Sequence, residues 1–133
     1  MRLLAATDLA LRVLMLLARA TPGEPVRVET LAERLGGQSR HHLHKIVQDL
    51  AAAGVVRTQR GAGGGVALAV APAALRLGPL IRRLEAGQAL VECERADGGA
   101  CTLAPGCRLR GLLGTAEARF YEALDAQTLA DII

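Results

Sequence analysis

VETLAERLGGQSRHHLHKIVQDLAAAG, residues 28–54, is the stretch that decides the fold. Apolar residues recur at helical spacing on both sides of the Gly36-Gly37 pair. The pattern therefore predicts one helix over 28–35 and a second over 40–53, with Ser39 in the capping position of the second. Two short helices around a glycine turn are typical of a helix-turn-helix.

The second of these helices has a strongly basic N-terminal half. That end of such a helix contacts base edges when the helix enters a major groove. Histidines two or three positions apart do not converge on one metal ion as an i, i+4 pair does, so groove contacts are favoured over a metal site. We therefore expect double-stranded DNA as the partner. The residues expected to contact it from this helix are Ser39, Arg40, His41, His42, His44 and Lys45.

Two short β-strands, over 55–58 and 66–70, follow the helix-turn-helix and are joined by a glycine-rich segment. A phosphate-binding loop of a nucleotide enzyme is the competing interpretation. It fails because no helix follows the glycines directly and no Gly-Lys-Ser/Thr is present. A hairpin in this place is a wing, which reaches phosphates or a minor groove. Its expected DNA-binding residues are Arg57, Arg60, Gly63 and Gly64.

Three more helices surround this unit. Thr7-Asp8 and the apolar residues after them predict a capped first helix, and Pro79 begins a short one. A longer amphipathic helix over 108–124 has little to pack on except a second copy of itself, so a homodimer is expected. Thr128 is expected to cap a last short turn.

The expected fold is mainly α with a small β-wing, a winged helix-turn-helix plus a long C-terminal dimerisation helix. We divide the chain into a DNA-binding domain over 1–78, a connecting helix and cysteine loop over 79–107, and a dimerisation helix with a final turn over 108–133. The length of 133 residues is enough to bury a core without disulfides.

Composition narrows the class of partner. Lysine and arginine number 16 against 13 acids, and the formal net charge of +3 favours polyanions. Aromatic residues make up 2% of the chain, which argues against single-strand binding by base stacking. The apolar N-terminal segment is interrupted by Asp8, Arg12 and Arg19, so it fits neither a signal peptide nor a membrane span. We expect a cytoplasmic protein with no membrane partner.

All three cysteines, Cys93, Cys101 and Cys107, lie in one loop, separated by gaps of seven and five residues. An odd number argues against a disulfide framework, and the gaps are long for a four-ligand zinc site. Longer gaps suit an iron–sulfur cluster, whose irons lie several ångströms apart. Zinc, a redox thiol site and inert cysteines remain open at this point. An iron–sulfur enzyme or electron carrier would leave the helix-turn-helix unused.

Five motifs resemble the NsrR-type nitric-oxide-sensitive transcriptional repressors over essentially the whole chain. They are Thr7-Asp8-Leu-Ala-Leu-Arg12, Ser39-Arg-His-His-Leu-His-Lys45, Arg60-Gly-Ala-Gly-Gly64, the three-cysteine loop Cys93…Cys101…Cys107, and Thr128-Leu-Ala-Asp131. The resemblance implies a homodimeric repressor that is not an enzyme and carries a 4Fe-4S cluster in each protomer, with a 2Fe-2S cluster as the other form considered.

In that family the three loop cysteines bind iron, and an acid at the start of the first helix completes the set from the other protomer; here this would be Asp8 of the partner subunit. The resemblance also implies that nitric oxide is the signal and that damage to or loss of the cluster releases an operator, expected to be palindromic. Alternatives are an iron- or redox-responsive member of the same family and a zinc- or thiol-based regulator.

Two departures from the family pattern stand out, and a third position separates the chain from a sister group. The gap from Cys93 to Cys101 is longer than is typical, which either distorts the loop or bulges outward at Asp97-Gly-Gly. The turn at 36–39 is one residue longer than usual and could re-aim the recognition helix. Arg110 stands where the related IscR-type regulators of cluster biogenesis have a histidine, which disfavours that assignment.

Overall fold

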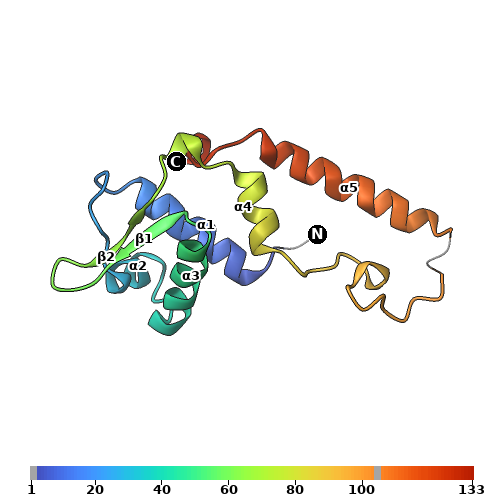
Figure 1. The fold of residues 1–133 in the computed structure, drawn as a ribbon, viewed down its shortest axis with the longest axis horizontal. Coiled ribbons are helices and arrows are strands. Elements are labelled where there is room, and N and C mark those ends of the chain that lie inside the picture. Colours follow the sequence, from blue (N-terminus) through green and yellow to red (C-terminus); the bar gives the residue numbers. More distant parts are fainter. Residues whose placement is uncertain (1–2, 104–105) are drawn as a thin grey trace.

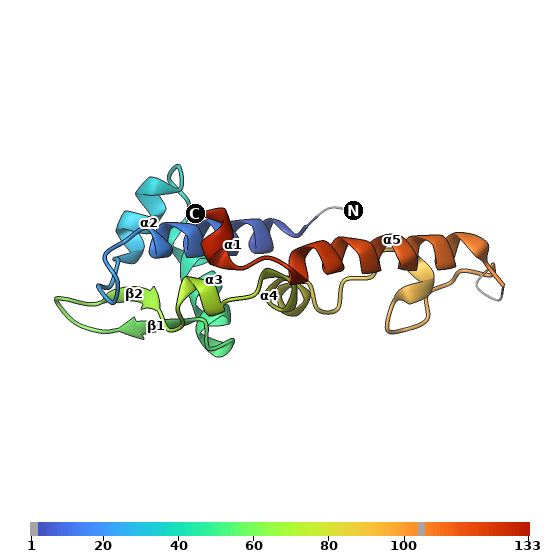
Figure 2. The same cartoon turned by 90° about the horizontal axis from the view of Figure 1, so that it is seen from above.

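A computed structural model describes residues 3–103 and 106–133 of the chain. Figures 1 and 2 show a helical domain with a small β-hairpin at one end and a long helix that projects away from it. The helices are α1 (Ala5–Ala18), α2 (Val28–Arg34), α3 (Arg40–Ala52), α4 (Leu77–Leu84) and α5 (Arg108–Asp125). Three short 3-10 helices are η1 (Pro72–Ala74), η2 (Glu92–Glu94) and η3 (Leu129–Ile132).

The predicted helix-turn-helix is confirmed. Leu31 on α2 and Leu43 on α3 are fully buried and pack into one core with α1 and α4. The chain turns after α2 through hydrogen bonds from the backbone N–H groups of Gly37 and Gln38 to the carbonyl of Ala32. Ser39 occupies the N-cap position of α3, but its side chain makes no capping hydrogen bond.

The predicted wing is confirmed as an antiparallel pair, β1 (Val56–Gln59) and β2 (Gly65–Leu68). The strands begin and end one or two residues away from the predicted bounds. The pairing sets the bounds, because Gln59 lies opposite Gly65 and leaves residues 60–64 to form the turn. The fold is thus the winged helix-turn-helix expected from the sequence.

The prediction that Thr7 and Asp8 cap the first helix was wrong. Helix α1 begins at Ala5, has Leu4 as its N-cap and has no side-chain cap, because two alanines of high helix propensity extend it toward the N-terminus. Thr7 therefore lies inside the helix with 1% of its surface exposed. Its hydroxyl has no hydrogen-bond partner among the described residues.

Helix α4 also begins earlier than predicted, at Leu77 rather than Pro79. A proline in the first helical turn removes an N–H that has no intrahelical acceptor, so it does not stop the helix. The last turn, in contrast, is capped as predicted: the Thr128 hydroxyl and backbone N–H both donate to Asp131, each at 2.7 Å.

The C-terminal turn returns to the winged helix-turn-helix. Leu129 is completely buried in the core, and its N–H donates to the carbonyl of Leu75 at 2.9 Å. The chain end therefore closes the domain that the N-terminal residues begin (Figure 1). None of the helices in the described part of the chain has the length and apolar character needed to cross a bilayer.

Candidate DNA-binding face and cysteine loop

The exposed face of α3 carries the basic residues identified from the sequence. Arg40, His41, His42, His44 and Lys45 are all exposed, whereas Leu43, Ile46, Val47 and Leu50 point into the core. Two ion pairs anchor this face: Arg40 with Glu29 at 3.6 Å and Lys45 with Asp49 at 3.0 Å. The imidazoles of His41, His42 and His44 are exposed and can be reached by a ligand that lies along α3.

Glu29, in the first turn of α2, holds the start of α3. A backbone hydrogen bond at Glu29 itself does most to lower the pKa of this carboxyl. Burial opposes it, and attraction from Arg40 and then from His44 adds to the lowering. The carboxylate is therefore ionised at neutral pH, and it keeps Arg40 at the junction of the two helices.

The wing is braced against the helices at two points. Arg27, at the N-cap of α2, donates to the carbonyl of Ala62 at 2.6 Å, and Arg57 donates to the carbonyl of Gly23 at 3.0 Å. Gly64 is required by close approach, because a Cβ there would overlap the backbone carbonyl of Gln59. Arg60 is exposed and makes no hydrogen bond or ion pair within the described residues.

A groove of about 410 Å³ separates α3 from the wing. His44 and Gln48 line it from the helix, and Thr58, Arg60 and Gly64 line it from the hairpin. The structure thus brings together, around one groove, part of each of the two residue sets expected to contact DNA. Gly63 lies at the wing tip in open space, with no atom near the position of a Cβ.

The cysteine loop lies along the first half of α5 and away from the wing (Figures 1 and 2). Cys93 is the central residue of η2, Cys101 follows the glycine turn, and Cys107 is the N-cap of α5. All three thiols are free and partly exposed. Residues 104 and 105, within the same loop, lie outside the described part of the chain.

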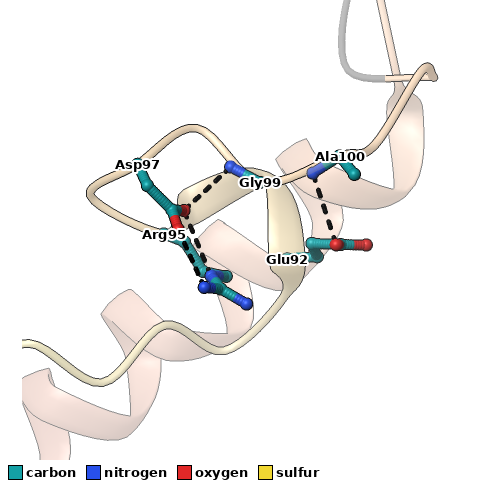
Figure 3. A network of polar contacts seen from close by, with 5 residues as sticks. All are labelled: Glu92, Arg95, Asp97, Gly99 and Ala100. Atoms are coloured by element: carbon teal, nitrogen blue, oxygen red, sulfur yellow. Dashed lines mark hydrogen bonds and ion pairs between the residues drawn. The ribbon is translucent and has the colours of Figure 1, made fainter.

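The segment between Cys93 and Cys101 folds on itself instead of distorting its surroundings. Arg95 forms two hydrogen bonds to Asp97, and Glu92 accepts one from the N–H of Ala100 (Figure 3). Asp97, Gly98 and Gly99 at the tip of this segment are exposed.

Within residues 3–103 and 106–133, no three His, Cys, Asp or Glu side chains are placed so that they could hold a metal ion. Asp8 is 60% exposed on the first turn of α1, where it pairs with Arg12 at 2.9 Å. The single chain thus does not bring the three cysteines and Asp8 together into a ligand set.

Helix α5 is joined to the domain through a junction that no local sequence pattern indicates. Arg82 of α4 makes two bonds to Asp125 of α5, at 2.5 and 2.7 Å, and its guanidinium lies 4.5 Å from the centre of the Tyr121 ring. The hydrogen bond from Arg82 lowers the pKa of Asp125, and the same bond raises that of Arg82. Burial, followed by the carboxylates of Glu117 and Glu85, raises the pKa of Tyr121.

Two further charged residues at the end of α4 also bond to distant parts of the chain. Glu85 is half-buried and accepts a hydrogen bond from the N–H of Leu4 at 2.9 Å, and Arg83 donates to the carbonyl of Ala52 at 2.8 Å. These partners lie 81 and 31 positions away in the chain. No local pattern could have indicated them.

The outer face of α5 is apolar and uncovered. None of the residues of α5 is fully buried, and Leu109 and Leu112 are 59% and 66% exposed. An exposed pair of leucines on one helical face is typical of a surface that packs against another protein.

Comparisons with known proteins agree with this architecture. A family model described as Rrf2, iron-dependent transcriptional regulator, matches residues 3–133. The HTH-type transcriptional regulator NsrR of Geobacillus kaustophilus is 41% identical over 133 residues, covering 100% of this chain and 90% of that protein. The HTH-type transcriptional repressor NsrR of Streptomyces coelicolor is 40% identical over 134 positions, covering 100% and 88%.

Solved structures give the same result. The structure of T. potens IscR superposes with a TM-score of 0.77 at 26% identity, covering 99% of this chain and 85% of that one. The structure of CymR, described as the global cysteine regulator of B. subtilis, superposes with a TM-score of 0.68 at 27% identity, covering 99% and 95%. The resemblance carried by the sequence motifs is confirmed, and the chain belongs to the Rrf2 family of transcriptional regulators, which are not enzymes.

Proposed function

We propose that the protein is a homodimeric repressor that binds operator DNA and senses nitric oxide through a 4Fe-4S cluster. The ligands would be Cys93, Cys101 and Cys107 of one protomer and Asp8 of the partner subunit. The observation that carries the proposal is the set of three free, partly exposed thiols in one loop beside α5. Thiolates are the ligands that iron–sulfur clusters take in proteins. Two of the relatives above carry the name NsrR, one of them as a repressor.

The donor set fits the group in its chemistry. Three thiolates leave one position for a different ligand, and Asp8 offers an exposed carboxylate at the start of α1. A carboxylate is a harder ligand than a thiolate, so the iron that it holds would be the more easily displaced one. When bound, the cluster would supply an iron atom at which a diatomic molecule such as nitric oxide can bind.

Loading the site requires the loop to close around the metal. Within residues 3–103 and 106–133, the three cysteines and Asp8 do not come together as a group of three or more possible ligands. Metal binding commonly completes the folding of exposed loop segments. Arg12, which holds the carboxylate of Asp8 in the single chain, would release or share it.

The link from Asp8 to DNA passes through α1. Leu9, Val13 and Leu14 on this helix are buried in the core that also holds α3. A change in the ligand at Asp8 would therefore shift α1 relative to the recognition helix, and in a dimer it would change the spacing of the two recognition helices. Coupling free energies between such sites are typically about 1–3 kcal/mol.

The test is anaerobic purification followed by absorption spectroscopy, iron and sulfide analysis, and titration with nitric oxide while operator binding is followed by gel shift. Protein with a cluster should shift DNA, and nitric oxide should abolish the shift. Cys101→Ala should prevent cluster assembly, whereas Asp8→Ala should give a cluster that is lost faster to a chelator. A colourless protein with stoichiometric zinc would refute the cluster.

An iron- or redox-responsive regulator is the second candidate. It is favoured by the family model, whose description is an iron-dependent transcriptional regulator. Parallel gel shifts with nitric oxide, oxygen and an iron chelator separate the two functions. Release of DNA by the chelator at concentrations of nitric oxide that have no effect would favour iron sensing.

A further inference from the structure

The seven residues between Cys93 and Cys101 form a closed turn with its own hydrogen bonds (Figure 3). The N–H of Arg95 donates to the carbonyl of Glu92 at 3.2 Å, and the N–H of Gly98 donates to the carbonyl of Arg95 at 2.8 Å. The segment therefore contains two consecutive turns.

The two ends of this turn are in contact. The Oε1 atom of Glu92 accepts from the N–H of Ala100 at 3.3 Å. Gly99 lies so close to Glu92 that a Cβ at Gly99 would overlap the Glu92 carbonyl oxygen, and its φ of +56° is in the left-handed region. Because Glu92 precedes Cys93 and Ala100 precedes Cys101, the contact brings the two cysteines to the base of one closed loop.

An ion pair at the tip holds the turn closed. Both oxygens of Asp97 accept from Arg95, at 3.1 and 2.8 Å, and Oδ1 also accepts from the N–H of Gly99 at 3.0 Å. The bond from Gly99, followed by the one from Arg95, lowers the pKa of Asp97, so the carboxylate is ionised at neutral pH. One carboxylate thus joins the two arms of the turn.

We propose that Arg95, Asp97 and Gly99 are positioning residues, which fold residues 94–100 outward and hold Cys93 and Cys101 together as a thiol pair before any metal is bound. Although seven residues separate Cys93 from Cys101 in sequence, the turn would place the two cysteines as a shorter segment does. The role in metal binding rests on the proposed function above, whereas the pairing of the two thiols does not.

Preorganisation is the physical reason for such a device. An open segment of this length must lose conformational entropy when its two cysteines are brought to one cluster. If the turn is already closed in the apo-protein, that entropy loss occurs on folding and not on metal binding. A cluster held by a preset pair should accordingly be lost more slowly.

The pairing is tested on full-length apo-protein that carries Cys107→Ser, so that only two thiols remain. In glutathione buffers, the Cys93 and Cys101 thiols reduce one glutathione disulfide to two glutathione thiols and form one protein disulfide. The equilibrium constant gives the effective concentration of one thiol at the other. Asp97→Ala should lower it about fivefold, as expected for the loss of three exposed hydrogen bonds that each contribute little on balance. An unchanged value would overturn the positioning role.

Two adjacent glycines give a matched comparison. Gly98 and Gly99 both have positive φ, of +79° and +56°, but a Cβ at Gly98 would meet no atom within 4 Å. Both alanine variants carry backbone strain, and only Gly99→Ala must also push Glu92 away. Gly99→Ala should therefore lower the effective concentration further than Gly98→Ala. Equal losses would show that the contact with Glu92 does not hold the thiols.

The consequence for the cluster is measured separately, as the rate of iron loss to a chelator in otherwise unsubstituted protein. Asp97→Ala should accelerate the loss about fivefold, and Glu94→Gln, in the same turn, should not, because it leaves the bonds of Asp97 intact. If no variant or parent protein assembles a cluster, the proposed function fails while the thiol equilibrium still decides the pairing. Altered thiol pairing with an unchanged rate of iron loss would overturn the metal-binding role alone.

Discussion

The carboxylate of Glu85, at the end of α4, accepts a hydrogen bond from the backbone N–H of Leu4, the N-cap residue of α1, at 2.9 Å. This hydrogen bond holds the N-terminal end of α1, the helix that carries Asp8. The same α4 is bonded to α5 through Arg82 and Asp125. Helix α4 is therefore the element through which the start of α1 and the long C-terminal helix are held in one arrangement.

Glu85→Ala is expected to destabilise the protein by about 1 kcal/mol, because it leaves a half-buried N–H without its acceptor. Chemical denaturation monitored by circular dichroism would measure the loss. Glu85→Gln is the matched control, because its amide oxygen can still accept the bond. Equal stability of the alanine and glutamine variants would mean that the contact contributes nothing.

The Arg82–Asp125 pair predicts a specific dependence of stability on pH. The folded-state pKa of Asp125 is lowered, so the pair stabilises the fold above the unfolded pKa of about 3.9 and loses this contribution as pH falls through the folded pKa. Asp125→Asn should flatten part of the fall in thermal midpoint below about pH 5. Arg82→Gln should flatten it to the same degree, and the double variant no further, since the two residues act as a pair.

The wing predicts a difference between its two arginines. Arg60→Ala should weaken binding to all duplex DNA and lower the slope of log K against log salt by about one, because one phosphate contact is lost. Arg57→Ala should change the slope less, because the Arg57 guanidinium already donates to Gly23. Fluorescence anisotropy at several salt concentrations measures both slopes. A slope unaffected by Arg60→Ala would remove this residue from the phosphate contacts.

The uncovered face of α5 predicts the effect of a charge on self-association. Leu112→Glu should weaken a dimer by at least tenfold, since burying one leucine contributes about 1.5–3 kcal/mol. Ala118→Glu, on the opposite side of the helix, is the control. Sedimentation equilibrium gives the dissociation constant of each. A dimer equally sensitive to both changes, or to neither, would place the interface elsewhere.

Thr7 predicts a stabilising substitution. Its hydroxyl is buried without a partner among the described residues, and Val has the same shape without the polar group. Thr7→Val should raise the free energy of unfolding by about 1 kcal/mol. A lower thermal midpoint for this variant would mean that the hydroxyl has a partner in solution or in the dimer.

The local sequence pattern was sufficient to predict most of the helices and strands of the domain. Apolar spacing placed α2 and α3 to within a residue or two, and Thr128 was recognised as a cap. It failed at the start of α1, because Thr7 and Asp8 have the residue types of a cap but Ala5 and Ala6 extend the helix beyond them. Propensity and tertiary packing outweighed the capping signal there.

The candidate sites were predicted to different extents. The basic face of α3 and the wing could be read from residue types and order, and the groove between them brings the two together. The three cysteines are clustered in the sequence, but the conformation of the segment between Cys93 and Cys101 depends on contacts among Arg95, Asp97 and Gly99. Those contacts need a specific backbone turn, which composition does not encode.

By itself the sequence determined the winged helix-turn-helix, because helical and strand periodicity, glycine turns and the basic face are all properties of neighbouring residues. Only the tertiary structure decided the bond from Leu4 to Glu85 and the pair of Arg82 with Asp125, whose partners lie 81 and 43 positions apart. Such pairs depend on how whole helices dock, and docking is set by the shape and burial of many side chains at once.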